Sequence, residues 1–165
     1  MLKNKLTAAA VAMCILLCGC SNNKDIDSQT TSITDISITA QQVFDAVKDK
    51  DYAADMNATA VFGDDVFTAN CEKLYGEPAE NFTDGGIMYV SSGASADEIS
   101  ILAGDSDCEK LLKDRVDRRV SDFEGYKPDE LDKIRSAEVF EYGGLWIMII
   151  SDKSDNIRSD IQAIS

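Results

Sequence analysis

The amino-acid sequence of 165 residues predicts an α+β fold in which helices cover an antiparallel sheet of about four strands. Two observations lead to this prediction. Two pairs of short apolar segments each enclose a glycine-containing turn, which is typical of β-hairpins. Stretches with apolar residues at helical spacing precede, separate and follow the two pairs. The expected order is α-α-β-β-α-α-β-β-α, and the order of the strands within the sheet is left open.

Two helices are expected at the start of the fold. Thr39 and Gln42 have the spacing of a capping box, so a helix is predicted over residues 39–50. Residues 51–63 show no clear period and are interpreted as either a short strand or a packed loop. The second helix is expected to end at Gly76, because glycine readily adopts the left-handed conformation that closes a helix.

The first hairpin is predicted next. A strand over residues 87–92 is followed by a turn at Gly93 and a second strand over residues 97–103. In the second strand isoleucines alternate with Glu98 and Ser100. Because successive strand residues point to opposite sides, this alternation indicates one apolar and one polar face.

The clearest amphipathic helix follows this hairpin. Ser106 and Glu109 have the spacing of a second capping box, and Gly125 is expected to end the helix. Pro128 then suits the first turn of a short helix. The apolar residues of the long helix recur at spacings of three and four: Leu111, Leu112, Val116, Val120 and Phe123.

A second hairpin is predicted near the end of the chain. Residues 139–142 and 145–151 are joined by the Gly143-Gly144 pair, which is typical of a tight turn. The segment LWIMII is apolar on both faces, which suits a central strand. A terminal helix is expected over residues 154–163.

The first residues of the chain have the pattern of a secretory signal. A short basic stretch precedes an apolar run over residues 6–17, which is too short to span a bilayer. The motif Leu17-Cys18-Gly19-Cys20 resembles the bacterial lipobox. By that resemblance, cleavage falls between Gly19 and Cys20, and a diacylglyceryl group is attached to the Cys20 sulfur. The alternative is an ordinary signal peptide with cysteines that carry no lipid.

The lipobox interpretation divides the chain into three parts. Residues 1–19 are the signal peptide, residues 20–37 are the lipidated cysteine with a flexible polar tether, and residues 38–165 are a single domain. Two acyl chains hold a protein stably on a membrane. The expected location is therefore the outer face of the bacterial cytoplasmic membrane, with the diacylglyceryl anchor on Cys20 as the membrane contact.

The composition excludes several classes of function. The formal net charge is −14, which argues against a nucleic-acid partner, because nucleic-acid-binding proteins present basic patches. The sequence contains no histidine, and this rules out a Ser-His-Asp triad, a Cys-His dyad and His-ligated zinc. No cofactor and no metal site are predicted. An envelope protein partner is considered instead.

Three separated segments carry a resemblance to a known family. They are residues 93–99 (GASADEI), 115–128 (RVDRRVSDFEGYKP) and 137–152 (AEVFEYGGLWIMIISD). Together they resemble a family of small bacterial lipoproteins, mostly from Gram-positive bacteria, that is described as a domain of unknown function. The resemblance spans roughly residues 40–155. It implies an envelope lipoprotein with this α+β domain, and it implies no particular activity.

Four charged residues are the candidates for a binding site. Asp97 and Glu98 are paired carboxylates that suit acid/base chemistry or calcium, but neighbours on a strand point apart, so capping or edge-charge roles are favoured. Arg115 lies on one side of a helix with Arg118 or Arg119, at spacings of three and four that suit clamping an anion. The favoured alternative is that these arginines form ion pairs or bond to carbonyl oxygens within the fold.

Cys71 and Cys108 are the thiols that remain in the predicted domain. Two interpretations stay open, a disulfide between them or two buried free thiols. A reactive Cys108 gains from its place at a helix N-terminus but is disfavoured by the adjacent carboxylates.

Three functions from different classes follow, and the third is metal buffering by the acidic surface. The favoured one is a membrane-anchored extracytoplasmic lipoprotein whose domain is a non-catalytic module for binding a ligand or docking a partner. The alternative is an envelope hydrolase that uses carboxylates or a cysteine, with a cavity where Asp97 or Glu98 meets Arg115 or Arg118.

Overall fold

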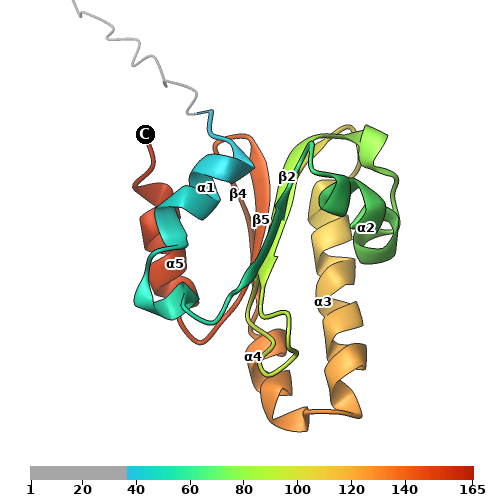
Figure 1. Cartoon of the computed structure of the whole chain (residues 1–165), viewed down its shortest axis with the longest axis vertical. Coiled ribbons are helices and arrows are strands. Elements are labelled where there is room, and N and C mark those ends of the chain that lie inside the picture. The colour runs from blue at the N-terminus through green and yellow to red at the C-terminus, as the bar shows by residue number, and fades with distance from the viewer. Residues whose placement is uncertain (1–36) are drawn as a thin grey trace, which may run out of the picture. The chain divides into compact units, whose positions relative to one another are not determined.

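A computed structural model describes residues 37–165 of the chain (Figure 1). The predicted signal peptide, the cleavage site at Gly19 and Cys20, and nearly all of the predicted tether lie outside the described residues. Within residues 37–165, no helix has the length and apolar character needed to cross a bilayer.

The predicted α+β class is confirmed, with one more strand than expected. The sheet is antiparallel throughout, with strand order β1-β2-β3-β5-β4. The strands are β1 (Ala58–Val61), β2 (Phe82–Tyr89), β3 (Glu98–Gly104), β4 (Glu138–Tyr142) and β5 (Leu145–Ile150). The fifth strand is β1, which lies within residues 51–63, the segment interpreted from the sequence as either a short strand or a packed loop. The apolar segment LWIMII forms β5, between β3 and β4, as predicted for a central strand.

Helices cover both faces of the sheet and make a three-layer fold (Figure 1). They are α1 (Ala40–Val47), α2 (Asp65–Tyr75), α3 (Cys108–Glu124), α4 (Leu131–Arg135) and α5 (Ser154–Gln162), with single 3-10 turns at Asp51–Ala53, Ala79–Asn81 and Pro128–Glu130. Helices α1 and α5 pack on one face, and α2, α3 and α4 on the other. The central strands therefore bury side chains toward both helical layers.

Some helix ends follow the predicted chemistry and others do not. Thr39 and Gln42 form the predicted capping box at the start of α1, and Gly76 closes α2 in the left-handed conformation. The second predicted capping box is wrong by one residue. Asp107, not Ser106, caps α3, and its side chain accepts a hydrogen bond from the Lys110 backbone N–H at 3.1 Å. The carboxylate also places negative charge at the positive end of the helix dipole.

The Gly85-Gly86 pair lies inside β2, although the sequence suggested that the strand begins after it at residue 87. A Cβ atom on Gly86 would lie 2.5 Å from the Phe44 ring of α1, and one on Gly85 would lie 3.0 Å from the Phe67 ring of α2. The two glycines therefore let an aromatic ring from each helical layer pack directly on the backbone of β2. Pairing with β1 and β3 holds this segment extended, despite the low strand propensity of glycine.

Candidate functional site

The candidate site is built around a carboxylate buried in the sheet. Glu98 is the first residue of β3, and its side chain is fully buried. Arg115 of α3 binds it through two parallel hydrogen bonds, from Nε to Oε1 at 2.9 Å and from Nη2 to Oε2 at 2.8 Å. The Ser100 hydroxyl also donates to Glu98 Oε1, at 2.8 Å. A fork of this kind fixes both side chains in direction as well as in distance.

The alternation in β3 explains how these groups meet. Glu98 and Ser100 lie on the face of the sheet that α3 covers, so the face that looked polar in the sequence is buried. Burial obliges each polar group to find a partner. Tyr75 of α2 extends the chain of bonds by donating its hydroxyl to Ser100 Oγ at 3.2 Å. Burial would lower the pKa of Arg115, but the charge and hydrogen bonds of Glu98 outweigh it and raise that pKa.

A second arginine approaches the same carboxylate. Arg119 Nε lies 3.2 Å from Glu98 Oε2, but the N–H is poorly aligned, and within residues 37–165 this buried nitrogen has no hydrogen-bond acceptor. Its Nη2 donates to the Ala96 carbonyl at 3.3 Å, and its guanidinium lies 4.6 Å from the centre of the Phe123 ring. Burial lowers the pKa of Arg119. Two nearly buried cations therefore share one buried carboxylate.

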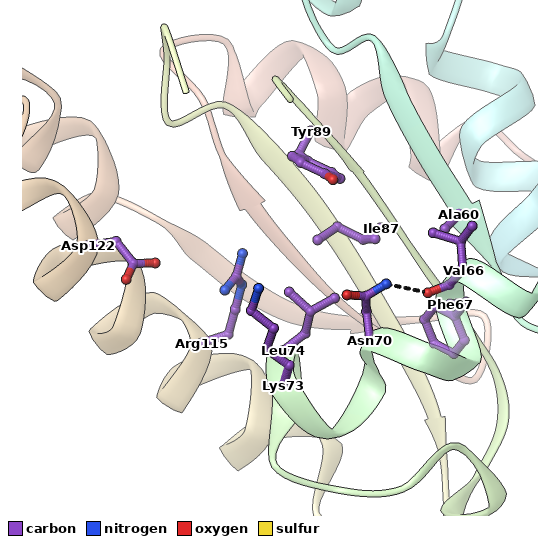
Figure 2. Close-up of a pocket in the computed structure, with 10 residues that line it drawn as sticks. All are labelled: Ala60, Val66, Phe67, Asn70, Lys73, Leu74, Ile87, Tyr89, Arg115 and Asp122. Carbon is purple, nitrogen blue, oxygen red and sulfur yellow. Dashed lines mark hydrogen bonds between the residues drawn. The ribbon is translucent and has the colours of Figure 1, made fainter. Parts of the chain in front are cut away.

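A cavity of about 240 Å³ adjoins this cluster, between α2, α3 and the β1–β2 side of the sheet (Figure 2). Its lining changes character from one side to the other. Arg115 and Lys73 reach it on the α3 side, whereas Ala60, Val66 and Phe67 lie on the far side. The remaining lining residues are Asn70, Leu74, Ile87, Tyr89 and Asp122. The arrangement suits a small molecule with one charged end and one apolar end.

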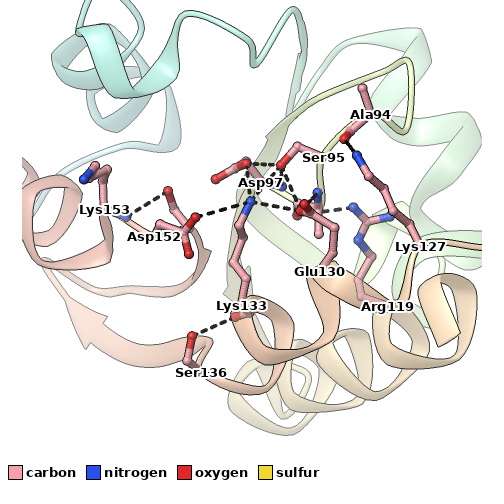
Figure 3. A network of polar contacts seen from close by, with 12 residues as sticks. Ala94, Ser95, Asp97, Arg119, Lys127, Glu130, Lys133, Ser136, Asp152 and Lys153 are labelled. Carbon is pink, nitrogen blue, oxygen red and sulfur yellow. Dashed lines mark hydrogen bonds and ion pairs between the residues drawn. The ribbon is translucent and has the colours of Figure 1, made fainter.

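A second polar cluster ties the start of β3 to α4 (Figure 3). Lys133 Nζ lies 2.9 Å from each of three oxygens, Ser95 Oγ, Asp97 Oδ2 and Glu130 Oε2. Glu130 Oε2 also accepts the Ala96 backbone N–H at 2.8 Å. Burial would raise the pKa of Glu130, but these hydrogen bonds and the Lys133 charge lower it to about 2.

The charge state of the second cluster decides what it can do chemically. Burial would lower the pKa of Lys133, but its bonds to Glu130 and Asp97 outweigh that and raise it. The Ser95 hydroxyl donates to Asp97 Oδ2, and the Lys133 ammonium group pairs with that carboxylate and with Glu130, so the charges of the cluster are satisfied by its own members. The cluster is suited to fastening the loop before β3 onto α4.

The predicted charged pairs are divided between the two clusters. Asp97 binds Lys133, and Glu98 binds Arg115, so the two neighbouring carboxylates do not share a site. Arg118 donates to the carbonyl oxygens of Asp114 and Lys73, each at 3.4 Å, and it does not line the cavity with Arg115. The two arginines therefore do not clamp one anion together, and Lys73 of α2 is the cation that lines the cavity with Arg115.

The structure holds Cys71 and Cys108 as two free, buried thiols, and the disulfide alternative is not formed. Burial raises the pKa of Cys71 to about 11. Burial, together with the Asp107 charge, also raises the pKa of Cys108. Both effects disfavour the thiolate form that a nucleophilic cysteine requires.

Sequence reasoning missed the contribution of α2 to the site. Lys73 and Asn70 enter the cavity only because α2 packs beside α3, and no local pattern signals that contact. Ser95 and Lys133 were missed for the same reason, since they lie 38 positions apart. Ser100 carried a usable signal, because its alternation with Glu98 placed both side chains on one face.

The fold and the site define a three-layer α+β domain with a cavity beside a buried ionic cluster. No family model, curated protein or solved structure matches the chain. The resemblance to small bacterial lipoproteins therefore stays a prediction. Within residues 37–165, no group of three or more Cys, Asp or Glu side chains is placed to hold a metal ion.

Proposed function

We propose that this chain is a lipid-anchored extracytoplasmic lipoprotein whose domain, residues 38–165, is a non-catalytic module that binds a small ligand. The lipobox-like residues 17–20 and the polar tether support the anchor. The acidic composition, with a net charge of −14, supports a domain that stays clear of an anionic membrane surface.

The observation that carries the binding role is the cavity between α2 and α3. It lies beside a charged cluster whose members already hold one another in place, so its polar wall is formed before any ligand arrives. Preformed concave sites of this kind, apolar with a few fixed polar groups, are typical of small-molecule binding.

The same geometry disfavours the hydrolase alternative. Glu98 is fully buried and engaged by Arg115 and Ser100, so it does not reach a substrate in the cavity. Asp97 is held by Lys133, and the pKa of Cys108 is raised. A general base must lie within hydrogen-bond reach of the proton that it removes, and none of these groups faces the cavity in that way.

The anchor is tested by mass spectrometry of the protein purified from bacterial membranes. The expected result is a mature chain that begins at Cys20 and carries a diacylglyceryl group on its sulfur. Cys20→Ala should leave the chain unprocessed and without lipid. An unmodified Cys20, or a chain that retains residues 1–19 in a cytosolic fraction, would contradict the proposal.

The binding role is tested with the lipidated chain in bilayer nanodiscs, with empty nanodiscs as the blank. Ligand-observed NMR should detect 3-phenylpropanol in the cavity, because its ring suits the apolar end. Ala60→Leu places a larger side chain on the cavity wall and should abolish the signal. Ala58→Leu, on the same face of β1 but outside the lining, is the control and should leave it unchanged. Equal signals from both variants would reject binding in this cavity.

A further inference from the structure

The buried charges beside the cavity do not balance. Glu98 carries the buried negative charge, whereas the Arg115 and Arg119 side chains are only 10% and 12% exposed. Charges interact more strongly where solvent is excluded, so the excess of one positive charge is felt in the cavity more than it would be on the surface. Lys73 adds a second positive group to the lining, at an exposed position.

Arg115 also keeps hydrogen-bond donors that the protein does not use. A guanidinium has five N–H groups in one plane, and Glu98 engages only the side that carries Nε and one N–H of Nη2. Within the described residues, Nη1 of Arg115 donates to no acceptor, and Arg115 is part of the cavity wall. The outer edge of the guanidinium is therefore free to bind a second pair of oxygens.

The rest of the cavity limits the size and character of the occupant. Its volume of about 240 Å³ is below the range of roughly 300–1,000 Å³ that is typical of sites for drug-sized ligands. The side away from Arg115 is formed by Ala60, Val66 and Phe67 (Figure 2). A short hydrocarbon or a single aromatic ring matches that surface.

We propose that the cavity binds a small organic carboxylate whose apolar body points away from α3. The carboxylate accepts hydrogen bonds from the outer edge of Arg115 and faces the ammonium group of Lys73. The apolar body packs against Ala60, Val66 and Phe67. This inference rests on the proposed binding function and names the class of ligand.

Two kinds of ligand carry a carboxylate of this kind, a free organic acid and a short peptide with its C-terminal carboxylate. Asp122 opposes either kind of ligand to the same extent, because this exposed carboxylate also lines the cavity and repels an anion. Solvent screens the exposed charge of Asp122 more than it screens the nearly buried charge of Arg115, so attraction prevails.

The head group is tested by comparing 3-phenylpropionate with 3-phenylpropanol on the full lipidated chain in nanodiscs. The two compounds share an apolar body, so a difference reports the carboxylate alone. The acid should bind on the order of tenfold more tightly, as expected for hydrogen bonds to a charged group. N-acetylphenylalanine and its amide form the peptide arm. If the acid is preferred over the amide by a larger factor than 3-phenylpropionate is preferred over 3-phenylpropanol, the site is assigned to peptide C-termini.

Exposed residues supply variants that do not threaten the fold. Lys73→Gln should weaken 3-phenylpropionate by about two- to fivefold, and Asp122→Asn should tighten it by a similar factor. The matched controls are Lys110→Gln and Asp49→Asn, which make the same charge changes at exposed positions outside the lining and should change affinity less than twofold. Arg115 is left intact, because its removal would strand Glu98.

The outcomes separate this inference from the binding function. If the acid and the alcohol bind equally and both are lost in Ala60→Leu, the cavity is a binding site but not a carboxylate site. If Lys73→Gln and Lys110→Gln weaken the binding of 3-phenylpropionate equally, only the overall electrostatic field of the protein acts on the ligand, and the inference is overturned. If none of the four compounds binds, the inference and the proposed function fail together.

Discussion

Both faces of the sheet are buried under helices, but side chains of different chemistry stabilise the two faces. Strand β3 is buried on both sides, yet Ile99 and Ile101 point to the α1–α5 layer, whereas Glu98 and Ser100 point to the α2–α3 layer. The first face is stabilised by apolar burial, which has no directional requirement. The second needs partners at fixed distances and obtains them from α2 and α3.

This difference indicates where function resides. An apolar layer tolerates changes that keep its volume, but it offers a ligand little to recognise. The α2–α3 layer holds oriented charges and unused donors beside a cavity. Buried polar groups with hydrogen-bonding capacity that the fold does not use are better evidence for a binding site than the volume of a cavity alone.

The largest effect should come from breaking the ionic cluster. Arg115→Met leaves Glu98 fully buried with only the Ser100 hydroxyl and the misaligned Arg119 beside it, and it should lower the free energy of unfolding by about 3–5 kcal/mol. Urea unfolding of wild type and variant at neutral pH measures this change.

A double variant distinguishes a stranded charge from lost packing. Glu98→Leu combined with Arg115→Met removes both buried charges and should recover a large part of the loss. A change below about 1 kcal/mol in Arg115→Met would show that Glu98 is not held as described.

The opposite face should respond in stability but not in binding. Ile149→Ala removes a fully buried side chain from the α1–α5 layer and should lower the free energy of unfolding by about 2–4 kcal/mol. Its affinity for 3-phenylpropanol at low temperature should stay within twofold of wild type. A loss of affinity much larger than this in the folded protein would mean that the two faces are coupled.

Local rules predicted much of the apolar architecture. The cap at Thr39, the left-handed close at Gly76 and the two-sided β5 each depend on residues close together in sequence. The sequence did not define β1 as a strand, because a short alanine-containing segment has little strand propensity of its own. Pairing with β2, such as that of Ala60 with Ile87, holds the segment extended.

The site depended on contacts that no local pattern records. The alternation of Glu98 and Ser100 was read correctly, but a solvated face and a face buried under α3 have the same period. Arg115 was singled out for its spacing from Arg118, yet its partner is a carboxylate 17 positions away. The packing of α3 on β3 decides which arginine side chain of α3 is buried.

The second cluster should give a pH-dependent effect of intermediate size. The pKa of Glu130 falls from its ordinary 4.5 to about 2, so the folded state favours the ionised form. The resulting stability is fully present above pH 4.5 and is lost as pH falls toward 2. Glu130→Gln should therefore cost about 1–3 kcal/mol at pH 7, allowing for solvent at this partly exposed site, and less at pH 3.

Urea unfolding at the two pH values measures the Glu130 effect. Glu80→Gln, at an exposed position, is the control and should show no such pH dependence. If the cost of Glu130→Gln were the same at pH 7 and pH 3, the pKa of Glu130 would not be lowered by its contacts with Lys133 and Ala96.

The smallest effect should come from the outer end of the polar chain on the α2–α3 face. Tyr75→Phe removes a buried hydroxyl that donates to Ser100 Oγ at 3.2 Å, and it should lower the free energy of unfolding by about 1 kcal/mol. The loss stays small because Ser100 still donates to Glu98, so the carboxylate keeps its partners. Tyr126→Phe, at a residue that is 70% exposed, is the control and should be neutral. A Tyr75→Phe cost that approached the cost of Arg115→Met would show that the hydroxyl, rather than the arginine, holds Glu98 in place.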